Sequence, residues 1–135
     1  MRPIPKGLGY AEAASFTAAY LTAYVALVRR ANLQKGESLL VHGAAGGVGL
    51  AAVDLGLHMG AIVIATASTE EKRAFLASYG AHHVLPPSGF RERVKELTKG
   101  EGANVIYDPV GGDVFDESVR CIAFDGRLLV IGFAG

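Results

Sequence analysis

Two patterns of apolar residues alternate along this chain. Short apolar runs bounded by turn-forming residues predict buried β-strands, and they fall at Ser38–His42, Ala61–Thr66, His83–Leu85, Asn104–Tyr107 and Arg127–Ile131. The segments before and between them carry apolar residues three or four positions apart, which predicts helices; these are Glu12–Arg30, Val48–Met59, Ser68–Tyr79, Phe90–Lys99 and Asp113–Ala123. Because strands alternate with helices, we expect an α/β fold with a doubly wound parallel sheet and helices on both faces.

Local signals support three of the helix boundaries. The segment Ser68–Glu71 reads Ser-Thr-Glu-Glu and has the form of a capping box, so we expect Ser68 to cap the helix that follows. Gly60 and Gly80 come directly after the second and third predicted helices, where glycine commonly serves as a C-terminal cap.

The composition fits one packed domain. The chain has 135 residues, of which 50% are hydrophobic and 19% charged, and these values exclude intrinsic disorder. Glycine is in excess, because 18 residues make about 13% of the chain against a usual value of about 7%. Two prolines and two glycines within residues 1–9 predict a linker or a cut domain boundary, and we expect residues 10–135 to form the domain.

Charge and cysteine content narrow the classes of function. Thirteen basic and thirteen acidic residues give a formal net charge of zero, which argues against a nucleic-acid or anionic-membrane partner. The single cysteine, Cys121, cannot form an internal disulfide, and no Cys or His pair has the spacing of a zinc site. The chain shows no signal-peptide pattern and no apolar run of about 18 residues, so we expect a cytoplasmic protein without a membrane segment.

The segment Gly43–Gly49, with the sequence Gly-Ala-Ala-Gly-Gly-Val-Gly, joins the first predicted strand to a helix. A dinucleotide-binding turn needs glycine here for a tight bend, for close approach of the backbone to a pyrophosphate, and for packing of helix on strand. Gly46 and Gly49 match the second and third glycines of the Gly-x-Gly-x-x-Gly fingerprint, and Ala44 departs from the first. No Lys-Ser or Lys-Thr pair follows, which excludes a Walker-type phosphate loop. The sequence therefore predicts a dinucleotide site.

The end of the second strand indicates which dinucleotide is bound. An Asp or Glu about 20 residues after the glycines would bind the ribose 2′-hydroxyl of NAD(H), but the strand ends in Thr66-Ala67-Ser68. Without that carboxylate, Ser68, Lys72 and Arg73 can supply a hydroxyl and positive charge to a 2′-phosphate, which favours NADPH. The alternative is that Ser68 only caps the helix and that the two basic residues lie on a solvated face.

These segments together resemble a known family. The glycine-rich segment, the helix Ala14–Tyr24, the turn Asp108–Gly112 and the segment Gly126–Phe133 look like the cofactor domain of the NADPH:quinone oxidoreductase (zeta-crystallin-like) branch of the medium-chain dehydrogenases/reductases. The resemblance covers nearly the whole chain from Tyr10. In zinc-dependent relatives a metal-ligating cysteine would fall near Ala14, so the resemblance implies the zinc-free branch.

The resemblance also implies the cofactor contacts. The pyrophosphate would be lined by Ala45, Gly46, Gly47 and Val48, the 2′-phosphate would be held by Lys72, and the nicotinamide ribose and carboxamide would lie along Asp108, Val110, Gly132 and Phe133. Thr22 either approaches the nicotinamide or is a core-facing hydroxyl.

The resemblance implies an oxidoreductase that transfers hydride from NADPH to a quinone or conjugated carbonyl and that forms a homodimer. Relatives carry a separate catalytic domain, so we expect residues 10–135 to be a cofactor domain that is inactive alone. Two alternatives stay open: an enoyl reductase of the same superfamily, and a non-catalytic NADPH sensor or crystallin-like structural protein.

Other polar residues have simpler interpretations. His82 and His83 are adjacent, so in a strand they point to opposite faces and cannot bind one metal ion together. Cys121 stands among apolar residues late in a predicted helix, which is typical of a buried structural thiol. Asp54 and His58 are four residues apart on a helix and predict a side-chain pair rather than a catalytic dyad.

Overall fold

A computed structural model describes residues 10–131 of the chain, with side chains from Phe16 onward. In chain order the elements are α1 (Tyr10–Tyr24), the π-helix η1 (Val25–Arg30), β1 (Ser38–Val41), α2 (Gly47–His58), β2 (Ile62–Thr66), α3 (Glu70–Tyr79), β3 (His83–Leu85), α4 (Phe90–Leu97), β4 (Ala103–Asp108), α5 (Asp113–Val119) and β5 (Ile122–Val130). The predicted elements are therefore present, and most boundaries differ by one or two residues.

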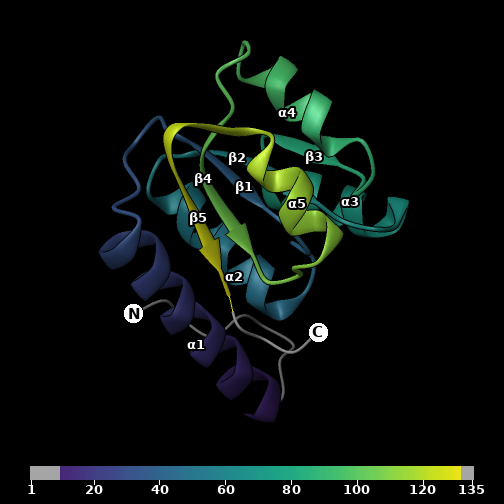
Figure 1. Ribbon diagram of the computed structural model, residues 1–135. Helices are drawn as coiled ribbons and strands as arrows, with labels where there is room; N and C mark the ends of the chain where they lie inside the picture. The colour runs from purple at the N-terminus through teal and green to yellow at the C-terminus, as the bar shows by residue number, and fades with distance from the viewer. Residues whose placement is uncertain (1–9, 132–135) are drawn as a thin grey trace.

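The strands form one parallel sheet in the order β3-β2-β1-β4-β5. The chain builds outward from β1 to β3 and then returns to the other side of β1 to form β4 and β5. Figure 1 shows helices on both sides of this sheet. The expected doubly wound parallel sheet is confirmed. Because the chain leaves β1 and β4 in opposite directions, a crevice at their carboxyl ends is the usual place for a ligand in such folds.

The two faces of the sheet bury separate apolar clusters, since successive side chains of a strand point to opposite faces. On β1, Leu39 and Val41 pack toward α1, η1 and α2, whereas Leu40 packs toward Phe90 and Val94 of α4. The three inner strands β1, β2 and β4 are buried along most of their length on both faces, which explains why their sequences are continuously apolar rather than alternating.

The first predicted helix changes its winding near its end. α1 is α-helical up to Tyr24, and η1 follows as a π-helix. The Ala31 N–H bonds to the carbonyl of Ala26, five residues earlier, at 2.9 Å. Hydropathy spacing cannot separate these two windings over six residues, so the sequence predicted one continuous helix.

The last predicted helix is shorter than expected and the last strand is longer. α5 ends at Val119 rather than Ala123, and β5 begins at Ile122 rather than Arg127. Ile122 pairs with Ala103, and the pairing then shifts so that Arg127 lies opposite Val105. Cys121, expected late in a helix, lies between the two elements and is buried as predicted.

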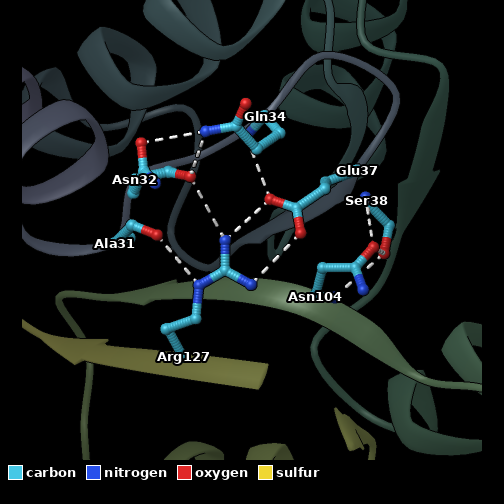
Figure 2. A network of polar contacts seen from close by, with 7 residues as sticks. All are labelled: Ala31, Asn32, Gln34, Glu37, Ser38, Asn104 and Arg127. Atoms are coloured by element: carbon cyan, nitrogen blue, oxygen red, sulfur yellow. Dashed lines mark hydrogen bonds and ion pairs between the residues drawn. The ribbon is translucent and has the colours of Figure 1, made fainter. Parts of the chain in front are cut away.

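A polar network joins Arg127, in the second half of β5, to the loop before β1 (Figure 2). Arg127 donates from Nε to the Ala31 carbonyl at 2.9 Å and from its two Nη atoms to the Glu37 carboxylate at 2.7 and 3.2 Å. Beside it, Asn104 Oδ1 accepts from the backbone N–H of Ser38 at 2.9 Å. The network lies at the end of the sheet opposite the strands' carboxyl ends.

Candidate functional site

The turn between β1 and α2, residues 43–49, bends sharply at the carboxyl edge of the sheet. We call it the glycine turn. Gly43 has a φ of 56°, a left-handed value that favours glycine. The Gly46 N–H donates to the Gly43 carbonyl at 3.1 Å, and the Ala44 N–H donates to the Thr66 carbonyl at 2.9 Å. The turn is thus held by its own backbone and by the end of β2.

The N-terminus of α2 is free of capping side chains. Its N-cap residue is Gly46, which makes no side-chain cap hydrogen bond, and a Cβ added to Gly47 would meet nothing within 4 Å. Ala45 and Val48 are half-buried and pack against the core, so their side chains do not cover the helix end. The first backbone N–H groups of a helix lack partners inside the helix. The arrangement fits a phosphate group of a dinucleotide.

Gly49 differs from Gly46 and Gly47 because it is needed for packing inside the domain. It is buried, and an added Cβ would collide with the carbonyl oxygen of Gly43 and lie 2.8 Å from the Cα of Ala44. Its missing side chain allows α2 to pack closely on the start of the turn, which is the role expected of the last glycine in the fingerprint.

The end of β2 places Ser68 and Lys72 at the surface. The helix α3 is capped by Thr69, whose hydroxyl accepts from the Lys72 N–H at 3.1 Å. The prediction that Ser68 caps this helix is wrong, because the helix begins one residue later and leaves the Ser68 hydroxyl outside the cap. Arg73 donates to the Ala67 carbonyl at 2.7 Å, whereas the exposed Lys72 ammonium has no ion-pair partner within residues 16–131. Lys72 is therefore the better placed cation for an anionic ligand.

The loop after β4 lies beside the glycine turn. The buried carboxylate of Asp108 turns back on its own chain, and its Oδ1 accepts from the N–H groups of Val110 and Gly111 at 2.9 Å each. The Val110 side chain is 54% exposed, and a Cβ at Gly43 would lie 3.2 Å from its Cγ2. Asp108 thus shapes the loop, and Val110 presents the loop's apolar surface beside the glycine turn.

Thr22 lies apart from the glycine turn. Its hydroxyl donates to the Ala18 carbonyl at 3.1 Å, and the side chain lines a groove of about 560 Å³ between the first helical segment and the carboxyl half of β5. It is half-buried rather than enclosed in the core. Gly132 and Phe133, expected to border the nicotinamide, lie outside the described residues.

A buried polar row that the sequence did not predict crosses the sheet directly below the glycine turn. Val41 pairs with Ala65 on one side and Tyr107 on the other, so the residues that follow them, His42, Thr66 and Asp108, stand side by side on three strands. We call these three residues the polar row. All three are at most 1% exposed. The only local signal was a histidine at the end of an apolar strand.

The imidazole of His42 is bonded at both nitrogens. Its Nδ1 lies 3.2 Å from Thr66 Oγ1, and its Nε2 lies 2.8 Å from Oγ of Ser118 on α5. The ring also stacks edge-on against Phe90, with centroids 4.6 Å apart. Burial lowers the pKa of His42 to about 4, although the negative charge of Asp108 opposes this shift. The imidazole is therefore neutral near neutral pH.

The remaining candidates have structural roles. His82 Nδ1 accepts from the Val63 N–H at 3.0 Å, and His83 belongs to β3. Asp54 and His58 approach to 3.8 Å, and Asp54 also accepts from the Tyr79 hydroxyl at 2.8 Å. Within the described residues, no three His, Cys, Asp or Glu side chains are grouped so that they could hold a metal ion. None of the described helices combines the length and apolar character that a membrane span requires.

Comparison with known proteins agrees with this geometry. The family model of the zinc-binding dehydrogenases matches residues 47–135. A quinone oxidoreductase-like protein 2 homolog of Nematostella vectensis is 42% identical over 133 residues, which cover 97% of this chain and 36% of that protein. Among solved structures, the CurK enoyl reductase matches with a TM-score of 0.86 and 37% identity over 97% of this chain and 40% of that one.

A second solved structure, the mycobacterial protein Rv1454c complexed with NADPH, matches with a TM-score of 0.85 and 38% identity, covering 96% of this chain and 40% of that one. The chain thus spans less than half the length of each of these three proteins. The resemblance to medium-chain dehydrogenases/reductases is confirmed. With its open glycine turn between the carboxyl ends of β1 and β4, this chain belongs to the zinc-binding dehydrogenase family.

Proposed function

We propose that this chain is the NADPH-binding domain of an oxidoreductase. The observation that carries the proposal is the glycine turn, which leaves the N-terminus of α2 without a capping side chain at the carboxyl edge of the sheet, between β1 and β4. The NADPH found in a solved neighbour of the same fold supports this choice of ligand. When bound, NADPH supplies the hydride of the reaction, and the residues of this chain hold and orient it.

Three groups of residues share this task. The pyrophosphate rests against the backbone of Ala45, Gly46, Gly47 and Val48, with Gly49 allowing the close packing behind it. Ser68 and Lys72 bind the 2′-phosphate, since Ser68 is exposed just after β2, Lys72 is exposed in the first turn of α3, and β2 ends without a carboxylate. Val110, on the loop that Asp108 shapes, borders the nicotinamide together with Gly132 and Phe133, and Thr22 approaches it from α1.

We further propose that residues 10–135 act as a cofactor domain within a zinc-independent homodimeric enzyme of the cytoplasm. The lengths of the relatives support one part of this proposal, that the domain belongs to a larger polypeptide, because the chain covers only 36% of a curated quinone oxidoreductase-like protein. Catalysis then needs a second domain to place the substrate against the cofactor. The substrate class we favour is a quinone or another conjugated carbonyl. An enoyl thioester is the second candidate, and the match to the CurK enoyl reductase favours it.

Cofactor titration followed by turnover assays tests these proposals in order. We expect the chain to bind NADPH more tightly than NADH, measured by calorimetry, and to leave NADPH unoxidised when a quinone is added. The polypeptide that joins this domain to its catalytic domain should oxidise NADPH when a naphthoquinone is supplied. Oxidation only with an enoyl thioester would select the second candidate, and binding without oxidation of either would indicate a sensor. A chain that binds neither nucleotide would reject the proposed function.

A further inference from the structure

The polar row directly adjoins the glycine turn. His42 is bonded covalently to Gly43, and Thr66 accepts the Ala44 N–H through its backbone carbonyl at 2.9 Å. Asp108 holds the N–H groups of Val110 and Gly111 with one carboxylate oxygen. The row therefore contacts both the glycine turn and the loop after β4.

The hydrogen bonds of His42 select one tautomer. Ser118 Oγ donates its proton to the Val114 carbonyl at 2.7 Å, so it can only accept from the imidazole. His42 Nε2 then carries the proton, and Nδ1 accepts from the Thr66 hydroxyl. The ring is fixed in orientation by one donor and one acceptor on different elements, namely β2 and α5.

Packing alone does not require a histidine at this position. The ring lies against Phe90 in an apolar cluster, where an apolar side chain of similar size would fill the space without desolvating two nitrogens. What an apolar side chain cannot do is make two directed hydrogen bonds to two other elements. The imidazole therefore contributes two directed hydrogen bonds, which fix the arrangement of the three elements, rather than additional apolar burial.

We propose that His42 is a positioning residue of the dinucleotide site. Its neutral imidazole ties the end of β1 to β2 and α5, and this fixes the direction in which the glycine turn leaves the sheet. The inference rests on the proposed function, because the turn is the surface that receives the pyrophosphate. His42 acts through the backbone of the turn and has no contact with the cofactor of its own.

The test compares His42→Leu with His42→Gln in two measurements on the chain. The first is native-state hydrogen exchange at the Ala44 and Gly46 amides, which are bonded within the turn and to β2. The second is NADPH affinity by calorimetry. For His42→Leu we expect exchange at these amides about tenfold faster than in the wild-type chain, and an NADPH Kd about tenfold higher, with exchange at Leu40 in β1 little changed. Glutamine can still donate from Nε2 to Ser118, so His42→Gln should recover most of both losses.

The control is Val94→Ala, which removes buried volume from the same apolar cluster on α4 without touching the turn. It should lower global stability and leave both the exchange of the turn and the NADPH Kd unchanged. If His42→Leu fails to fold, Ser118→Ala removes the acceptor of Nε2 with little change in volume and should loosen the turn in the same direction.

Two results would overturn the inference: unchanged turn exchange in both His42→Leu and Ser118→Ala, or an equal effect in Val94→Ala. Equal defects in His42→Gln and His42→Leu would contradict the hydrogen-bond basis. The exchange measurement needs no cofactor, so it decides the role of His42 even if the wild-type chain does not bind NADPH. Failure of the wild-type chain to bind NADPH would reject the proposed function instead.

Discussion

Arg127 of β5 donates to both carboxylate oxygens of Glu37 at 2.7 and 3.2 Å, although 90 residues separate the two in sequence. Their side chains are 30% and 24% exposed, so the pair is shielded more than a surface ion pair. The hydrogen bonds from Arg127 lower the pKa of Glu37 below its ordinary value. The pair joins the loop before the first strand to the last described strand of the sheet.

Replacing Arg127 should therefore destabilise the fold. Arg127→Met keeps the apolar stem and removes every donor, and we expect a loss of about 1–2 kcal/mol in the free energy of unfolding measured in urea. Arg127→Lys should recover less than half, because an ammonium cannot donate to both oxygens in the same fork. Arg93→Met is the control, since the Arg93 side chain is exposed and the substitution removes only a contact of 4.0 Å between Arg93 Nε and Glu96 Oε1. Equal stability of Arg127→Met and wild type would contradict the structural role.

Gly49 and Gly47 should respond differently to the same substitution. Gly49→Ala places a Cβ against the Gly43 carbonyl oxygen and 2.8 Å from Ala44 Cα, so we expect a loss of about 2–3 kcal/mol in stability. Gly47→Ala meets nothing within 4 Å and should leave stability unchanged or slightly raised. If the pyrophosphate rests on this backbone, Gly47→Ala should still weaken NADPH binding. Thermal unfolding and calorimetry measure both effects, and a Gly47→Ala chain that binds NADPH normally would move the pyrophosphate elsewhere.

The sequence was most informative where local chemistry dictates structure. The glycine turn could be placed from spacing alone because a strand-to-helix bend at this edge needs glycine for conformation and for close packing, as Gly43 and Gly49 show. The fold class could also be predicted, because strands that alternate with helices along the chain indicate a parallel sheet. The predicted ends of helices and strands were less accurate where pairing between distant segments determines them. The backbone of Cys121 accepts from the Ala103 N–H at 2.9 Å, and no pattern near Cys121 reveals that contact.

The polar row shows the other limit of sequence analysis. His42 is 24 residues from Thr66 and 76 from Ser118, so its two partners become visible only when the strand order and the position of α5 are known. A serine within an exposed-looking helix and a threonine at a strand end carry no signal of this pairing. The Arg127–Glu37 pair could not be predicted for the same reason, since 90 residues separate the two in sequence.

Lys72 provides the sharpest test of cofactor preference. If its ammonium binds the 2′-phosphate, Lys72→Met should weaken NADPH binding by about 1.5–3 kcal/mol, the range for hydrogen bonds to charged groups, and leave NADH binding nearly unchanged. Calorimetric titration with both nucleotides gives the two values. Lys99→Met removes the same charge from an exposed position at the end of α4 and should change neither. Equal losses of binding free energy for NADPH and NADH would show that Lys72 does not bind the 2′-phosphate.

Cys121 should be protected from alkylation in the folded chain. The thiol is fully buried, and burial raises its pKa to about 11. Since the thiolate is the reactive form, iodoacetamide at about pH 8 should modify native Cys121 at least about a hundredfold more slowly than the urea-unfolded chain. The chain has one cysteine, so mass spectrometry reports this site alone. Similar rates in both states would show that the junction between α5 and β5 opens readily.

The buried His42 should make stability depend on pH in a defined window. Its pKa is about 4 in the folded chain against an ordinary value of 6.5, so the unfolded chain takes up the proton first as pH falls. The stabilising contribution is complete above 6.5 and is lost as pH falls toward about 4, and the pKa difference corresponds to about 3 kcal/mol in total. Urea unfolding at about pH 7 and about pH 5 should show about 2 kcal/mol of this loss in the wild-type chain and a smaller loss in His42→Gln, which has no proton to take up at this position. Carboxylates such as Glu37 contribute to both chains alike, so the difference between the two slopes isolates the imidazole. Parallel slopes would mean that His42 is charged or accessible in the folded state, and the tautomer that joins Thr66 to Ser118 would then be wrong.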